Sequence, residues 1–195
     1  MGLTVTTEPG IEPVSRDAAK AHLRVTVDDD DELIDVLIAA ARRTLERSTA
    51  RSFIDTSWTY TLDRFPDSAS KPIRLPRSPV DSVTSIKYTD TDAVLQTWSS
   101  AEYDVDAASE PGRIVPAYGY TWPSDVRPGT NAVTILFKAG YGTTVASVPA
   151  DLRVAVKMVL AHLYEHRELA IEQTLHVVPD AVQRIVMLNR VMEAV

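Results

Sequence analysis

The chain contains no cysteine, few glycines and no long apolar run, and each absence excludes a class of protein. Without cysteine there is no disulfide framework, thiolate zinc site, iron–sulfur cluster or cysteine nucleophile. The seven glycines form neither a phosphate-binding loop nor a dinucleotide-binding turn. No stretch approaches the roughly 20 apolar residues of a membrane span, so we expect no membrane partner.

Positive charge is also scarce, because 20 Lys and Arg residues face 27 Asp and Glu residues, for a net charge of −7. A protein that grips DNA or an anionic membrane usually presents a basic surface. The charge therefore disfavours a nucleic-acid-binding protein, which would show DNA affinity that falls steeply with salt. The content of 45 % apolar and 24 % charged residues is that of an ordinary globular protein.

Helical periodicity marks the first quarter of the chain. Ser15 is placed to cap a short helix that ends near Leu23. A longer helix is predicted over about 29–50, because its apolar residues recur at helical spacing: Ile34, Leu37, Ile38, Ala41 and Leu45. The acidic run 28–32 suits the positive end of that helix dipole, and it lacks the alternation and the glycine of a calcium loop. An acidic patch that faces a basic partner stays open.

From about residue 57 the apolar period changes to two. Alternation is clearest around Trp58, Tyr60 and Leu62 and again around Val133, Ile135 and Phe137. Eight of the twelve prolines lie from Pro66 to Pro128 and separate short strand candidates. This pattern predicts an antiparallel sheet rather than βαβ units.

Three tryptophans lie in the strand region, and we interpret Trp58 and Trp98 as residues of the sheet core. Trp122 is followed by Pro123 in a loop rich in Gly and Pro. These two residues are therefore a possible interface loop, with Trp122 as its anchor.

Helical spacing returns after the Gly140-Tyr141-Gly142 turn, and Pro179 and Asp180 open a last helix. Ten of the 15 residues from Ala181 to Val195 are apolar, so this segment packs on its own domain or docks on another chain. The predicted fold class is α+β: mainly a helical bundle with an inserted antiparallel β region of short strands and an extended C-terminal helical segment. We predict a single domain over 1–195, with helices about 15–52 and 148–168, a β insertion about 57–142 and a docking segment about 169–195.

His162-Leu163-Tyr164-Glu165-His166 matches the H-x-x-E-H pattern of inverted zinc peptidases. On a helix the two histidines lie one turn apart and could bind one metal ion, with Glu165 as a base. Catalytic zinc needs a third protein ligand, and only Glu168 and Glu172 follow nearby. The competing interpretation is a solvated helix end whose imidazoles and Arg167 cap the last carbonyls. We favour it and expect no metal, no cofactor and no catalytic residue.

Several segments, in order and at consistent spacing, resemble the head–tail connector (adaptor) proteins of tailed bacteriophages and gene transfer agents. The segments are Ala19-Lys20-Ala21-His22-Leu23-Arg24-Val25, Ile38-Ala39-Ala40-Ala41-Arg42, Leu75-Pro76-Arg77-Ser78-Pro79-Val80, Tyr103-Asp104-Val105, Trp122-Pro123, Ala139-Gly140-Tyr141-Gly142, Val148-Pro149 and Tyr164-Glu165-His166-Arg167-Glu168. Members of that family carry a similar helix end without being metalloenzymes.

The resemblance implies a structural subunit, not an enzyme, that forms a dodecameric ring beneath the portal at the head–tail junction of the particle. Its partners would be the portal ring, copies of itself, a downstream stopper or tail-completion protein, and double-stranded DNA that passes through without sequence-specific binding. The C-terminal segment would bind the portal, especially through Leu175, Val177, Val178, Ile185 and Leu188. The long first helix and the β region would make contacts between subunits and toward the tail. The alternatives are another tail-completion or stopper protein of the neck and, further off, the zinc peptidase.

Overall fold

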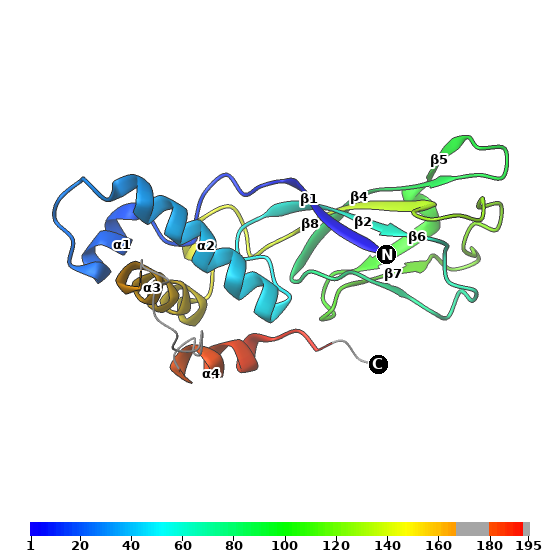
Figure 1. Cartoon of the computed structure of the whole chain (residues 1–195). Coiled ribbons are helices and arrows are strands. Elements are labelled where there is room, and N and C mark those ends of the chain that lie inside the picture. Colours follow the sequence, from blue (N-terminus) through cyan, green and yellow to red (C-terminus); the bar gives the residue numbers. More distant parts are fainter. Residues whose placement is uncertain (167–179, 193–195) are drawn as a thin grey trace, which may run out of the picture. The chain divides into compact units, whose positions relative to one another are not determined.

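The computed structural model describes residues 1–166 and 180–192, which fall into two compact units (Figure 1). The β unit comprises residues 1–9, 55–141 and 191–192 of the described chain. The helical unit comprises residues 10–54, 142–166 and 180–190. The chain passes from one unit to the other near Gly142, whose φ of +136° favours glycine, as expected for a strand-to-helix turn.

Two antiparallel sheets make up the β unit. The larger sheet has the order β1-β2-β8-β4-β5 and the smaller one the order β3-β7-β6. Their strands are β1 (Gly2–Thr7), β2 (Thr56–Leu62), β3 (Ile73–Arg74), β4 (Val80–Thr89), β5 (Leu95–Trp98), β6 (Tyr103–Asp106), β7 (Arg113–Pro116) and β8 (Val133–Ala139). A short 3₁₀ helix, η1 (Ser100–Glu102), joins β5 to β6.

The core of the β unit forms where period-two alternation points apolar residues inward. Along β8, Val133, Ile135, Phe137 and Ala139 are buried and the residues between them are partly exposed, as the sequence predicts. The same core takes in side chains of both sheets, including Ile114 of β7. The two sheets therefore share one core.

The helical unit contains α1 (Arg16–Leu23), α2 (Asp31–Thr49), α3 (Ala150–Glu165), α4 (Asp180–Asn189) and the 3₁₀ helix η2 (Val145–Ser147). The predicted stripe of α2 is confirmed, with four buried residues: Ile34, Ile38, Ala41 and Leu45. It packs against a matching stripe on α3 that includes Leu152, Val156 and Leu160. Ser15 caps α1 as predicted, since its hydroxyl accepts a hydrogen bond from the Ala18 N–H (3.3 Å).

The α+β class is confirmed, but a mainly helical chain is not, because helices make up 33 % and strands 27 % of the described residues. The β region is larger than an insertion of short strands for two reasons. A strand at residues 2–7 joins the larger sheet, and β3, β6 and β7 form a second sheet. The single domain over 1–195 stays a prediction, and the segment 167–179 lies outside the described residues. Within the described ranges, no helix is long and apolar enough to cross a membrane.

Candidate assembly surfaces

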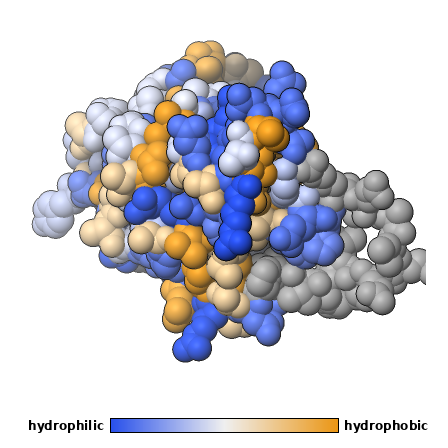
Figure 2. Space-filling view, turned by 90° about the vertical axis from the view of Figure 1, so that its left-hand side faces the viewer, coloured by the Kyte–Doolittle hydropathy of each residue, from blue (hydrophilic) through white to orange (hydrophobic). Residues whose placement is uncertain are grey.

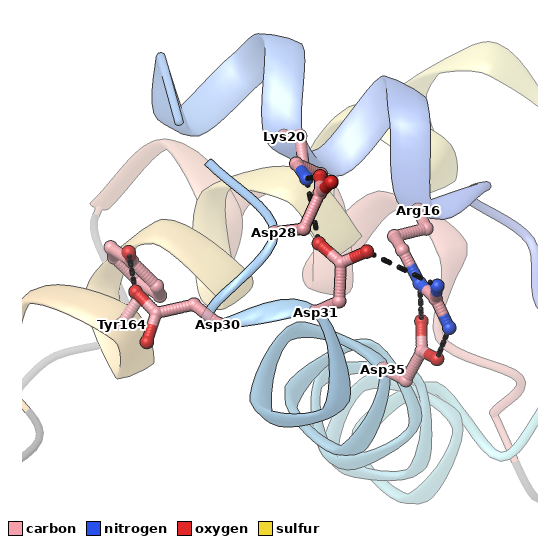
Figure 3. A network of polar contacts seen from close by, with 7 residues as sticks. All are labelled: Arg16, Lys20, Asp28, Asp30, Asp31, Asp35 and Tyr164. Carbon is pink, nitrogen blue, oxygen red and sulfur yellow. Dashed lines mark hydrogen bonds and ion pairs between the residues drawn. The ribbon is translucent and has the colours of Figure 1, made fainter. Parts of the chain in front are cut away.

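The acidic run at the start of α2 is engaged by two cations of α1 (Figure 3). Lys20 Nζ lies 2.6 Å from a carboxylate oxygen of Asp28 and 2.6 Å from one of Asp31. The Arg16 guanidinium pairs with Asp35 and, at 3.3 Å, with Asp31. Two members of the run, Asp28 and Asp31, therefore pair with basic side chains of their own chain, while Asp28, Asp29 and Glu32 are exposed. An acidic patch that faces a basic partner stays a prediction.

Two of these pairs lower the pKa of a carboxyl group, at Asp28 and at Asp35. The hydrogen bond from Lys20, followed by its charge, lowers the pKa of the Asp28 carboxyl, and the hydrogen bond from Arg16 lowers the pKa of Asp35. Asp30 accepts a hydrogen bond from the Tyr164 hydroxyl of α3 at 2.5 Å. The loop between α1 and α2 is therefore tied to two helices, and the run stabilises the helical unit.

The side chain of His166 caps the end of α3 at the carbonyl of His162. His166 Nδ1 lies 2.9 Å from the His162 carbonyl oxygen, and the His166 backbone N–H donates to the same oxygen at 3.1 Å. The two rings lie side by side, with centroids 4.4 Å apart. The capping interpretation is therefore confirmed for His166. Glu165 is exposed, Arg167, Glu168 and Glu172 lie outside the described residues, and no group of three metal-binding side chains occurs within 1–166 and 180–192.

Helix α4 is held to the helical unit along one side and exposes apolar residues on another. Val182 is fully buried, and Arg51 Nε donates to the Asn189 carbonyl oxygen at 2.6 Å. Met187 and Leu188 are 76 % and 78 % exposed. Of the residues predicted to bind the portal, Leu188 is therefore accessible. Ile185 is half-buried, and Leu175, Val177 and Val178 lie outside the described residues.

The indole of Trp122 lies in the core of the β unit and not on a surface, which corrects its prediction as an interface anchor. It is only 6 % exposed, stacks on Phe65 at 5.5 Å between centroids, and lies 5.3 Å from the Trp98 ring. Its Nε1–H donates to the Ser68 carbonyl oxygen at 3.0 Å. A tryptophan in a Gly- and Pro-rich loop can pack into the core of its own chain or bind a partner. Because Trp122 is buried, it packs into the core.

The same loop does present aromatic residues that the sequence analysis missed. Tyr118 is fully exposed and Tyr120 about half exposed, while Pro123 is half-buried. The loop is fixed at its start, where the Ala117 N–H donates to the Glu102 carbonyl oxygen at 2.9 Å. An interface role of the loop would therefore rest on the two tyrosines and Pro123.

Hydrophobic residues on the helical side of the molecule form small patches between hydrophilic ones (Figure 2). The exposed apolar side chains of this unit are Ile11, Val27, Val36, Val154, Met187 and Leu188. Met187 and Leu188 are consecutive and more exposed than the other four, which makes α4 its most apolar accessible surface.

Comparisons with known proteins agree with a structural role. Residues 17–110, just under half of the chain, match the family described as phage gp6-like head–tail connector protein. The match spans α1, α2 and β2 to β6, and it confirms the resemblance seen in the sequence. The family is one of structural connectors and not of enzymes. Comparison with curated proteins gives no match.

Solved structures with the same fold come from gene transfer agent particles. A chain of the virion of a native particle is 22 % identical, with a TM-score of 0.81, and a chain of the neck of an empty particle, computed with C6 symmetry, is 23 % identical with a TM-score of 0.79. A chain of the neck of a native particle, computed with C12 symmetry, is 24 % identical with a TM-score of 0.72. Each alignment covers 100 % of this chain and 98 % of the other.

Proposed function

We propose that this chain is a connector subunit of the neck, at the head–tail junction of a phage or gene transfer agent particle, because residues 17–110 match the phage gp6-like head–tail connector family. The observation that carries the proposal is the likeness in fold over the whole chain to subunits of such particles. The likeness covers both units, so the β unit belongs to the same architecture as the family segment.

The subunit forms a ring, and twelve copies are the expected number. The neck computed with C12 symmetry supports this number, because its chain shares the fold along the entire length. A closed ring needs two different surfaces on each copy that meet head to tail. DNA passes through the centre without being held, since a chain with net charge −7 neutralises few phosphates.

The exposed face of α4 and the segment before it bind the portal ring above. Met187 and Leu188 support this assignment, because they leave apolar area in water that a partner would cover. Leu175, Val177, Val178 and Ile185 remain part of the proposed portal contact. A stopper or tail-completion protein binds on the opposite side of the ring.

Light scattering of the purified chain, alone and mixed with the portal protein of the same particle, tests the proposal. We expect a complex near one copy per portal subunit. Removing the segment after Glu168 would also remove the fully buried Val182 and so confound folding with binding. The double substitution Met187→Ser/Leu188→Ser changes only exposed side chains. It should weaken binding by at least about a hundredfold, because burial energies of roughly 1.5 to 3 kcal/mol per side chain sum to about 3 kcal/mol or more.

A matched control is Val36→Ser, which removes an exposed apolar side chain from α2 and should leave portal binding unchanged. Unchanged affinity of the α4 double variant would contradict the portal assignment. Absence of any complex at all salt concentrations would favour the alternative of another tail-completion or stopper protein of the neck. Stoichiometric zinc that is lost on His162→Ala would instead favour the peptidase.

A further inference from the structure

The larger sheet of the β unit has two open edges. In the order β1-β2-β8-β4-β5, β1 and β5 each pair with one strand among the described residues. The outer edge of each strand therefore presents backbone N–H and C=O groups that a further strand can bind.

Both edges lack two of the features that usually keep edge strands from pairing, charge and proline, while β1 does have a bulge between Val5 and Thr7. The segments Gly2–Thr7 and Leu95–Trp98 contain no charged residue and no proline, in a chain that is 24 % charged. Each also carries an exposed apolar side chain, Val5 at 39 % and Leu95 at 63 %. The edges of the smaller sheet are different, because β3 carries Arg74 and β6 carries Asp104 and Asp106. Of the four edge strands in the two described sheets, β1 and β5 are therefore the two without charge.

The directions of the two edge strands fit a head-to-tail contact. Every neighbouring pair in the larger sheet is antiparallel, so its first and fifth strands run in the same direction. A copy related by rotation about an axis along the strands could place its β1 beside β5 of the first copy, and the two would pair in parallel. The contact uses a different surface on each partner, as a closed ring requires.

We infer that β5 of one copy pairs with β1 of the next, so that the larger sheets continue from subunit to subunit around the ring. This inference rests on the ring proposed above and names its contact. The partner is a second copy because one chain carries both uncharged edges. Strand β5 has only four residues, so this contact is far smaller than the roughly 1,600 Å² of a stable complex. We therefore expect it in the assembled ring and not in a free dimer.

Disulfide mapping tests the inference directly, because the chain has no cysteine of its own. Thr4 and Thr97 are exposed, and both lie on the sheet face opposite Trp58 and Trp98. The test variant Thr4→Cys/Thr97→Cys carries one thiol on each edge. A second variant, Thr4→Cys/Leu95→Cys, places the β5 thiol two residues earlier on the same face of the sheet. It tests a pairing of β1 with β5 in which the register is shifted by two residues.

Within one chain the two thiols are about 19 Å apart, four strand spacings, so a disulfide between them can form only between copies. Oxidation of the portal-bound ring should convert one of the two double variants into a ladder of covalent oligomers on a non-reducing gel. The control Thr4→Cys/Thr84→Cys moves the second thiol to the interior strand β4 and should give no ladder. Dimers from Thr4→Cys alone would mean that β1 pairs with β1 and would overturn the inference.

The ring itself is measured separately, by light scattering of the same samples before oxidation. Rings of the expected mass in which neither edge-to-edge variant cross-links would overturn the inference and leave the proposed function intact. Failure of all samples to form a ring on the portal would overturn both.

Discussion

Replacing Arg42 of α2 should destabilise the helical unit strongly, because the guanidinium compensates carboxylates in the interior. Arg42 and Glu46 are 3 % and 5 % exposed, and Arg42 Nη1 lies 2.9 Å from Glu46 Oε2. Arg42 also contacts both carboxylate oxygens of Glu12, through Nε at 2.7 Å and Nη2 at 3.2 Å. The second oxygen of Glu46 accepts the Phe53 N–H at 2.7 Å, which fixes this carboxylate in place.

Arg42→Met removes the cation and leaves the Glu46 carboxylate inside. The expected cost in free energy of unfolding is about 3–5 kcal/mol, the usual penalty for breaking a buried pair from one side. For a chain of this size, that cost lowers the melting temperature by roughly 6 to 20 °C. Urea denaturation followed by far-ultraviolet circular dichroism measures it, with the exposed Arg47→Met as a control expected within about 0.5 kcal/mol of the wild type.

The double variant Arg42→Met/Glu46→Gln separates the charge from the hydrogen bond, because a Gln oxygen can still accept the Phe53 N–H. It no longer leaves an uncompensated carboxylate inside, so most of the lost stability should return. An Arg42→Met protein within about 1 kcal/mol of the wild type would refute the reasoning. A double variant less stable than the single one would also refute it.

Three further outcomes are expected. The pKa of Asp35 is lower in the folded chain than its ordinary value of 3.8, so its pairing with Arg16 stabilises the fold above pH 3.8 and is lost as the pH falls below that value. The variant Asp35→Asn should therefore show a smaller loss of stability at acid pH than the wild type. An unchanged acid limb of the stability–pH profile would contradict this. Trp122→Ala should cost the β unit about 3–5 kcal/mol in chemical denaturation, whereas unchanged stability with lost partner binding would restore its role as a surface anchor. Gly142→Ala should lower the free energy of unfolding by about 1–3 kcal/mol, because φ is +136° and the new Cβ would lie 2.7 Å from Ser147 Oγ. The control is Gly10→Ala, whose Cβ would have no atom within 4 Å and whose effect on stability should be near zero.

Helices and strands in which apolar residues recur at a constant spacing could be predicted from the sequence, because this pattern is local. The stripe of α2 repeats over about three turns, and the alternation of β8 covers seven residues, so both can be recognised without knowledge of the partner element. Whether the Trp122 side chain is buried or exposed could not be predicted from its own loop, because its burial depends on Phe65 and Trp98, which come from other parts of the chain. In the same way, Lys20 and Arg16 pair with Asp28, Asp31 and Asp35 only after α1 has packed beside α2.

Strand β1 escaped prediction for a related reason, and this bears on the proposed ring contact. Five of its six residues pair with residues of β2 that lie 50 to 59 positions away, and only Leu3 and Val5 supply apolar alternation. Whether a strand lies at an edge is a property of sheet order, which local composition does not encode. A short uncharged segment such as Leu95–Trp98 is unremarkable inside a sheet, where neighbours bind both of its sides. At an edge, the same lack of charge leaves one side open to pairing, and the topology puts two such edges on one chain.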